Sequence, residues 1–338
     1  MLKRRNKMKN TIHQIFKKLL CNDSLTENCY TVANIPPIKA HKLGIDREGR
    51  PMFFIQSTIT DKVPNINLEM MSVQFNELCR LKKNNAPKNI FESYYTVITL
   101  KTDLPDYVRY FLDIVCIVLE KIGETPSQQV LLTEIQKIID LFRRFSAPPL
   151  KTIQGLWAEL FVIERANNPK YLVKSWHTSA IDTFDFNDGT DKIEVKSTSR
   201  NNRIHHFSHN QLTPNKGSNV VIASIQIVQS GMGKSIHDLR ESIESKLNEP
   251  DLRFKLIDVI TKTLGANFDK AHECCFDYAL ACDAYRLFDI NDIPCIDCCS
   301  IPEEIDNIHY DCNLSSVKSV EVPSVAYPKS ELFKSLVK

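Results

Sequence analysis

The sequence has little glycine and no long apolar segment. Glycine accounts for only 9 of the 338 residues, which argues against a fold built on repeated glycine-rich phosphate loops. The longest apolar runs, such as residues 114–119, are far shorter than the roughly 20 residues of a membrane-spanning helix, so we expect no contact with a membrane. Charged residues make up 25% of the chain and hydrophobic residues 43%, which excludes a disordered polyelectrolyte. A chain of this length is expected to form two or three cores.

An excess of charge of one sign is also missing. The 43 Lys and Arg residues nearly balance the 41 Asp and Glu residues, so any nucleic-acid surface must be a local patch. The eleven cysteines occur without a recognisable secretion signal, and we therefore expect reduced thiols and a cytoplasmic location. The cysteines near 295–299 could bind zinc or an iron–sulfur cluster, but their spacing favours structural thiols. The basic segment 3–18 is expected to be a docked first helix rather than a helix that binds membranes or nucleic acid.

Hydrophobic periodicity predicts an α/β protein with a boundary at the Ser-Ala-Pro-Pro segment 146–149. Before the boundary we expect a hairpin at 41–55, strands at 70–75 and 94–100, and helices at 105–119 and 127–145. After it we expect a helix at 152–166, strands at 171–176, 183–187 and 192–198, a helical turn near 206–212, a strand at 219–228 and a helix at 235–247. The last region should contain a helix at 254–264 and strands at 276–280 and 285–288. The expected domains are an N-terminal α+β domain at 1–148, a core with a mixed sheet flanked by helices at 149–250, and a C-terminal extension at 251–338 packed on that core.

The most informative stretch is the predicted hairpin at 183–198. Its Asp188-Gly189 pair is a strong turn signal. A four-residue loop would place Asp185 directly opposite Glu194, whereas a two-residue turn would place Asp185 opposite Lys192 with Glu194 on the diagonal. Cross-strand partners lie about 5 Å apart and diagonal ones about 7–8 Å apart. Either register lets the two carboxylates approach one hard cation.

These residue types suit phosphodiester hydrolysis. Mg²⁺ binds one or two carboxylates together with waters and a substrate phosphate, and it activates water and screens charge on phosphorus. Asp185 and Glu194 would supply the carboxylates. Lys196, two residues further along the same face, could orient the water or stabilise the developing anion. Glu159, on the preceding helix, could add a further carboxylate.

Polar and basic residues follow this stretch. Arg200, Arg203 and His206 accompany Lys196, and Ser197 adds a neutral donor suited to phosphate oxygens. We therefore expect this segment to contact nucleic acid, although an ordinary polar surface loop explains each single residue equally well.

The residues resemble the PD-(D/E)XK nuclease superfamily. An acidic residue in a strand, a short hairpin and then Glu-x-Lys, in α-β-β-β-α-β order, look like its signature. The chain is closest to a branch encoded near restriction–modification and phage-defence genes, matched by Gly155-Leu-Trp-Ala-Glu-Leu160, Phe184-Asp-Phe186 and Ile193-Glu-Val-Lys-Ser197, and by a downstream element at His206 and Gln211-Leu212. In this sequence Phe184 stands where the superfamily motif has proline, which lowers the specificity of the match.

The resemblance implies a restriction-endonuclease-like core with Asp185, Glu194 and Glu159 as metal ligands. It makes Asp185, Glu194 and Lys196 catalytic. The polar and basic stretch that follows predicts Ser197, Arg200, Arg203, His206 and Gln211 as nucleic-acid contacts. The implied function is a Mg²⁺-dependent DNA endonuclease of restriction or phage-defence type, with Mn²⁺ as a substitute metal. An ATPase or methyltransferase partner and a homodimer are compatible with it.

Two other interpretations use the same residues differently. The alternative function is a catalytically inactive DNA-binding or scaffold subunit that keeps the nuclease fold. Separately, Ser230-Gly-Met-Gly-Lys-Ser235 resembles a P-loop, but Val228 stands where the pattern needs its first glycine. We therefore expect no nucleotide cofactor.

Overall fold

The computed structural model describes residues 2–21, 29–56, 63–84, 86–145, 147–149, 151–177, 182–215, 217–321 and 326–336. The chain divides into two compact units, and one of the boundaries between them falls at residue 254, inside a helix. The first unit contains Met1–Ser146 and Asn248–Phe254, and the second contains Ala147–Leu247 and Lys255–Lys338. Within the described ranges, every helix is too short or too polar to cross a membrane. The mixture of sheets and helices confirms the α/β class.

The first unit is built on a closed five-stranded sheet, which the sequence did not reveal. The strand order is β1-β2-β3-β6-β5, and a parallel pairing of β1 with β5 closes the sheet. The predicted hairpin at 41–55 is confirmed as β2 and β3, with Gly49 at a φ of 79° in the connecting turn. The strands are β1 Tyr30–Asn34, β2 Lys42–Ile45, β3 Pro51–Ile55, β4 Ile66–Asn67, β5 Met71–Lys83 and β6 Ala86–Leu100.

Three helices complete this unit: α1 Leu2–Leu20, α2 Pro105–Ile122 and α3 Gln128–Arg144. The predicted docking of the basic first helix is confirmed, because Ile12 and Leu19 of α1 are fully buried. Lys9 Nζ and His13 Nε2 each lie 2.9 Å from the buried carboxylate of Asp113 on α2. A buried acid thus fixes the cationic face of α1, since a buried charge needs a partner.

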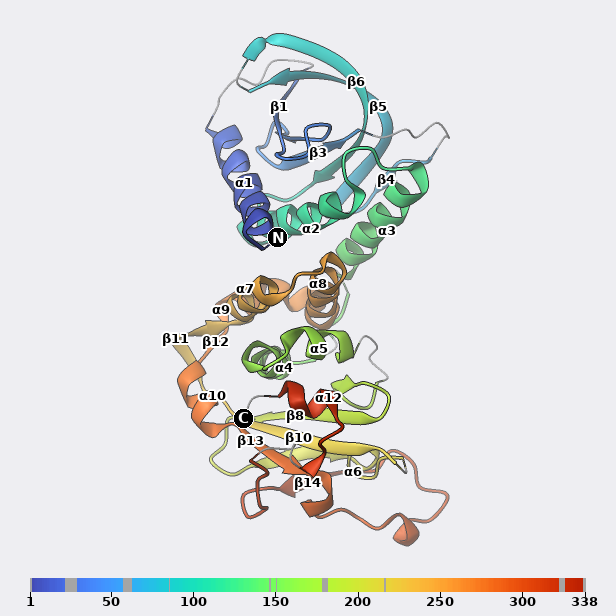
Figure 1. Ribbon diagram of the computed structural model, residues 1–338, viewed down its shortest axis with the longest axis vertical. Coiled ribbons are helices and arrows are strands. Elements are labelled where there is room, and N and C mark those ends of the chain that lie inside the picture. The colour runs from blue at the N-terminus through green and yellow to red at the C-terminus, as the bar shows by residue number, and fades with distance from the viewer. Residues whose placement is uncertain are drawn as a thin grey trace. The chain divides into compact units, whose positions relative to one another are not determined.

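The second unit contains a four-stranded mixed sheet in the order β13-β10-β8-β7. Strands β8 and β10 are parallel, and the two outer pairings are antiparallel. These strands are β7 Phe186–Asn187, β8 Asp191–Thr198, β10 Asn219–Gln226 and β13 Arg286–Asp289. Figure 1 shows helices α4 Ile153–Arg165 and α5 Pro169–Ser175 on one side of the sheet. A two-stranded ladder of β9 Ile204–Ser208 and β14 His309–Asn313 lies on the other side with the short helix α6 His209–Leu212.

An apolar cluster joins that ladder to the sheet. Phe207 of β9, Leu212 of α6 and Ile222 of β10 all belong to it and are nearly or fully buried. The remaining elements are β11 Gln229–Ser235, α7 Ile236–Lys246, α8 Pro250–Leu264, α9 Phe268–Glu273, β12 Cys275–Phe276, α10 Tyr278–Ala284 and α12 Glu331–Ser335, with 3-10 turns at Gly265–Asn267, Ile290–Asp292 and Cys298–Ser300.

Two predicted strands are wrong in the same way. Residues 171–176 fall mostly in helix α5, where Pro169 occupies the first turn and the Asn168 side chain accepts from the Tyr171 N–H at 3.2 Å. Residues 278–280 begin helix α10, whose N-cap Asp277 accepts from Leu280 N at 3.0 Å. In both cases an Asn or Asp cap starts a short helix, and the alternation of apolar residues suggested a strand instead.

The P-loop-like segment forms strand β11 and not a phosphate loop. An added Cβ at Gly233 would lie 2.1 Å from the carbonyl oxygen of Phe276 on the paired strand β12. The Lys234 ammonium lies 3.5 Å from the ring centroid of Tyr278, and the Lys234 carbonyl accepts from Trp157 Nε1 at 2.8 Å. The glycine therefore allows the close approach of β12, and the half-buried lysine packs against the Tyr278 ring.

Replacing Gly233 by alanine should destabilise the second unit by about 2 kcal/mol or more, because the new methyl group would meet backbone atoms that cannot move aside easily. Gly231→Ala, two residues away in the same strand with nothing within 4 Å of its added Cβ, should change stability by no more than about 0.5 kcal/mol. Denaturant unfolding followed by tryptophan fluorescence measures this, because both tryptophans, Trp157 and Trp176, lie in the second unit. Equal midpoints for the two variants would contradict the prediction.

Candidate metal centre

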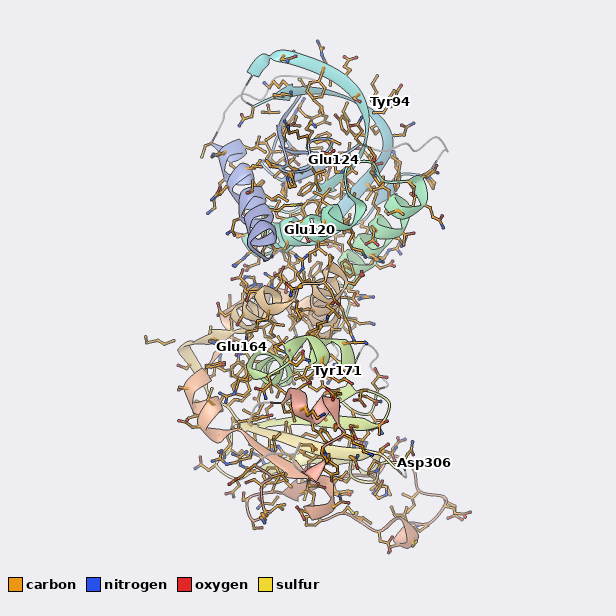
Figure 2. The ribbon with its side chains drawn as sticks, viewed as in Figure 1. Tyr94, Glu120, Glu124, Glu164, Tyr171 and Asp306 are labelled. Atoms are coloured by element: carbon orange, nitrogen blue, oxygen red, sulfur yellow. The ribbon has the colours of Figure 1, made fainter. Side chains whose placement is uncertain are left out.

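The site begins where the pairing of β7 with β8 ends. Phe186 lies opposite Ile193 and Asn187 opposite Lys192, the register in which Asp185 would face Glu194 if the pairing continued. This is the four-residue-loop register of the two considered from the sequence. The Asp188 side chain shapes the loop by accepting from Thr190 N at 3.1 Å and Asp191 N at 2.9 Å. Tyr171, labelled in Figure 2, donates to the same carboxylate at 3.0 Å and ties α5 to the loop.

The backbone of Asp185 does not pair with β8. Its side chain instead accepts a hydrogen bond that a backbone carbonyl would accept in a continued ladder. Its Oδ2 accepts from Val195 N at 2.8 Å, while its own carbonyl accepts from His177 N at 2.8 Å. The carboxylate therefore binds a backbone N–H of β8 that β7 leaves unpaired. Asp185 itself is buried, at 4% exposure. This finding excludes a solvated hairpin face for Asp185.

Glu159 lies on helix α4, which is buried on nearly every side because residues 156–164 are all buried. Its Oε2 accepts from Trp176 Nε1 at 2.7 Å and lies 3.1 Å from His177 Nε2. Its Oε1 accepts from Lys151 Nζ at 2.7 Å, and the same ammonium donates to Asp185 Oδ1 at 2.5 Å. Lys151 thus bridges the helix carboxylate and the hairpin carboxylate.

Glu194 forms the other side of the site. Its Oε1 accepts from Gln211 Nε2 at 2.6 Å and lies 2.9 Å from Lys196 Nζ. Lys196 also donates to Gln211 Oε1 at 3.1 Å and lies 5.0 Å from the Phe207 ring centroid. The second oxygen, Oε2, is buried and has no hydrogen-bond partner among the described residues. A buried carboxylate oxygen of this kind is ready to accept a cation or a proton.

The environments separate the pKa values of the three carboxyl groups. Burial and the neighbouring Asp185 charge raise the pKa of Glu194 to about 8. Burial and the Glu159 charge also raise the pKa of Asp185. Burial acts on Glu159 in the same direction, but the hydrogen bond from His177 and the charge of Lys151 outweigh it and lower the pKa of Glu159. Glu159 is therefore the most firmly ionised of the three.

A divalent cation fits the donor set. One ligand atom each from Glu159, His177 and Asp185 lie within 4.8 Å of one another. Two carboxylates and an imidazole are ordinary ligands for divalent metals. Glu194 is not part of this group, but the Asp185 charge acts on it and its buried Oε2 has no hydrogen-bond partner among the described residues. Glu159, Asp185 and Glu194 were all expected from the sequence.

His177 and Lys151 were not expected from the sequence. His177 follows the segment that alternation assigned to a strand, so nothing in the local pattern directs it toward Glu159. Lys151 lies one residue before Thr152, the N-cap of α4. That cap predicts where the helix starts but not where the preceding side chain goes.

The expected nucleic-acid contacts occupy different environments. Gln211 lies inside the site and contacts both Glu194 and Lys196. Ser197 Oγ accepts from Gln154 Nε2 of α4 at 3.2 Å. Arg200 is exposed at the end of β8.

Arg203 and His206 lie further from the carboxylates' hydrogen-bond network. The Arg203 guanidinium donates to Ser224 Oγ at 2.8 Å and to the Ala284 carbonyl, so it connects the interior of the sheet to α10. The His206 ring is 67% exposed and its Nδ1 lies 2.9 Å from Asp311 Oδ1.

A family comparison agrees with this geometry. Residues 17–315 match the model of the family DUF4420, described as "Putative PD-(D/E)XK family member". Because the match covers most of the chain, the protein belongs to this family, and its description points to a nuclease-like function. No curated protein and no solved structure matches the chain significantly.

The raised pKa of Glu194 predicts a specific pH dependence of stability without metal. The folded protein holds the Glu194 proton up to about pH 8, whereas the unfolded chain loses it near the ordinary glutamate pKa of 4.5. Stability from this group is therefore complete below the unfolded pKa and is lost as pH rises toward 8, by about 1.4 kcal/mol per pH unit. Glu194→Gln should remove that slope.

The measurement is the free energy of unfolding of the second unit in chelator at several pH values, from tryptophan fluorescence. Glu273→Gln, at an exposed position of α9, is the matched control and should keep the wild-type slope. Parallel curves for wild type and Glu194→Gln would show that Glu194 titrates normally.

Proposed function

We propose that the protein is a metal-dependent DNA endonuclease that hydrolyses phosphodiester bonds. The observation that carries this proposal is the meeting of Asp185, Glu194 and Glu159, all at most 5% exposed, beside the ammonium of Lys196. Buried carboxylates are costly unless they bind cations. A stability role alone gives no reason to bring three of them to one place.

In the proposed mechanism, Asp185 with Glu194 and Glu159 holds the cation, and Mg²⁺ or Mn²⁺ bound there would activate water and screen charge on the phosphate. Lys196 has the position of an electrostatic partner. Its ammonium is fixed by Glu194 and Gln211, so it needs no reorganisation to donate to an oxygen that gains charge. Gln211 is a positioning residue, because it binds both members of the Glu-x-Lys pair.

The fold and the family support the finer assignment. The mixed sheet with β8 at its centre, helix α4 on one face and the Asp185 hairpin at the edge is compatible with a restriction-endonuclease-like core. The resemblance to restriction and phage-defence proteins supports DNA as substrate. It also supports an ATPase or methyltransferase partner and a homodimer that cuts both strands.

One observation favours a second candidate, an inactive nuclease-fold DNA-binding subunit. Lys151 donates a hydrogen bond to each of Glu159 and Asp185, so the chain itself supplies a counter-ion to these carboxylates. The two candidates differ in whether divalent metal enters the site.

Cleavage assays test the nuclease assignment. Wild-type protein should cut plasmid or phage DNA with Mg²⁺ or Mn²⁺ and not with EDTA. Glu194→Ala and Lys196→Ala should each lower the rate about 100-fold or more, because one removes an oxygen ligand and the other a fixed positive charge. Lys174→Ala, at an exposed lysine of α5, should cut like wild type.

Equal cutting by wild type and both site variants would identify a contaminant and refute the site. Absence of cutting by any protein, together with DNA binding that needs no metal, would favour the inactive subunit.

Arg200 tests the substrate surface separately from catalysis. In a Glu194→Ala background, Arg200→Ala should weaken binding to duplex DNA and reduce the slope of log affinity against log salt by about 0.9, the value for one lost phosphate contact. Lys174→Ala in the same background should leave the slope unchanged. Fluorescence anisotropy at several salt concentrations measures both, and an unchanged slope for Arg200→Ala would remove Arg200 from the interface.

A further inference from the structure

The Lys151 ammonium stands in a place that a metal ion would use. It lies 2.7 Å from Glu159 Oε1 and 2.5 Å from Asp185 Oδ1. The same two carboxylates, with the His177 imidazole, form the cation-binding group whose ligand atoms lie within 4.8 Å of one another. An ammonium in contact with both carboxylates and a metal ion bound to the same two oxygens exclude each other.

The burial of the three groups is unequal. The side chains of Glu159 and Asp185 are 3% and 6% exposed, whereas that of Lys151 is 35% exposed. The carboxylates are fixed by α4 and by the backbone N–H of Val195. Lys151 precedes the helix and ends in a flexible four-carbon stem. Of the three, only the lysine can withdraw to solvent without disturbing the core.

The Lys151 ammonium reduces the electrostatic repulsion between the two buried carboxylates. Two ionised carboxylates close together in a buried place repel each other strongly, and a cation between them relieves the repulsion. The chain supplies that cation itself. It can therefore fold before any metal arrives.

We propose that Lys151 is an internal counter-ion that occupies the Glu159–Asp185–His177 position in the metal-free protein and is displaced to solvent when a divalent cation binds. This inference rests on the proposed function in that it takes Glu159 and Asp185 as metal ligands. The imidazole nitrogen of His177 makes the site better suited to Mn²⁺ than to Mg²⁺, which prefers oxygen ligands alone. The lysine lowers metal affinity by competition and limits metal entry to conditions in which the cation is abundant.

Metal binding and stability test the exchange without any need for catalysis. Mn²⁺ titration by calorimetry should show that Lys151→Met binds about tenfold or more tightly than wild type, the size of effect expected from removing one adjacent charge. In chelator, Lys151→Met should melt at a lower temperature than wild type because its carboxylates lose their counter-ion. Saturating Mn²⁺ should therefore raise its melting temperature by more than it raises that of wild type.

Two other lysine variants locate the effect. Lys174→Met removes a positive charge from the surface of the same unit and should match wild type in both measurements. Lys151→Arg keeps the charge and should show no gain in Mn²⁺ affinity. If Lys151→Met does not fold in chelator, Lys151→Gln, which keeps a hydrogen-bond donor without the charge, replaces it with the same expected gain.

The proposal fails if Lys151→Met and Lys151→Gln bind Mn²⁺ with wild-type affinity or more weakly. It also fails if Glu159→Gln in the Lys151→Met background leaves the gain intact, because the metal would then bind elsewhere. Wild-type protein that cuts no DNA but shows the Lys151-dependent gain would refute the nuclease assignment and leave the exchange standing. Metal-dependent cleavage by wild type without a gain in Mn²⁺ affinity in the Lys151 variants would refute the exchange and leave the nuclease assignment standing.

Discussion

The burial of several carboxylates at one point is the constraint on which the second unit depends. A charged group removed from water is stable only with a compensating charge or hydrogen bonds. The neighbouring elements supply these compensating charges and hydrogen bonds. Trp176 and His177 bind Glu159, Val195 binds Asp185, Gln211 and Lys196 bind Glu194, and Lys151 joins two of the acids. The site is therefore also a junction that holds α4, the β7–β8 hairpin and α6 together.

The shortness of β7 makes this junction possible. If the β7–β8 ladder continued, the backbone of Asp185 would pair with β8 and its side chain would alternate toward one face. Instead the ladder stops after Phe186 and Asn187, and the Asp185 carboxylate takes the N–H of Val195. From that edge it can meet Glu194 on the strand and, through Lys151, Glu159 on the helix. Because pairing is limited to the two residues of β7, the Asp185 carboxylate can contact groups from both the strand and the helix.

Local patterns predicted the parts of the site that depend on local geometry. The Asp188-Gly189 turn and the two-residue period of strands predicted the hairpin and two possible registers. The observed register is one of these two. Groups that depend on the path of the chain were missed. His177 follows a short capped helix that alternation assigned to a strand. The closed sheet of the first unit depends on β1 pairing with β5, across about fifty residues that carry no local signal for that contact. Arg203 has the side chain of a typical phosphate ligand, but its partners on β10 and at the end of α10 come from distant parts of the sequence.

The charges around Lys151 are compatible with the proposed exchange of this lysine for a divalent ion. At neutral pH Glu194, with its pKa raised to about 8, holds a proton in part, so the burden of negative charge falls mainly on Glu159 and Asp185. One ammonium between these two is then a sufficient counter-charge. A divalent cation that displaces that ammonium brings one more positive charge than it removes, and ionisation of Glu194 supplies the matching negative charge. In the proposed exchange the site would hold either Lys151 with a protonated Glu194 or a metal with an ionised Glu194, and its net charge would be the same in both states.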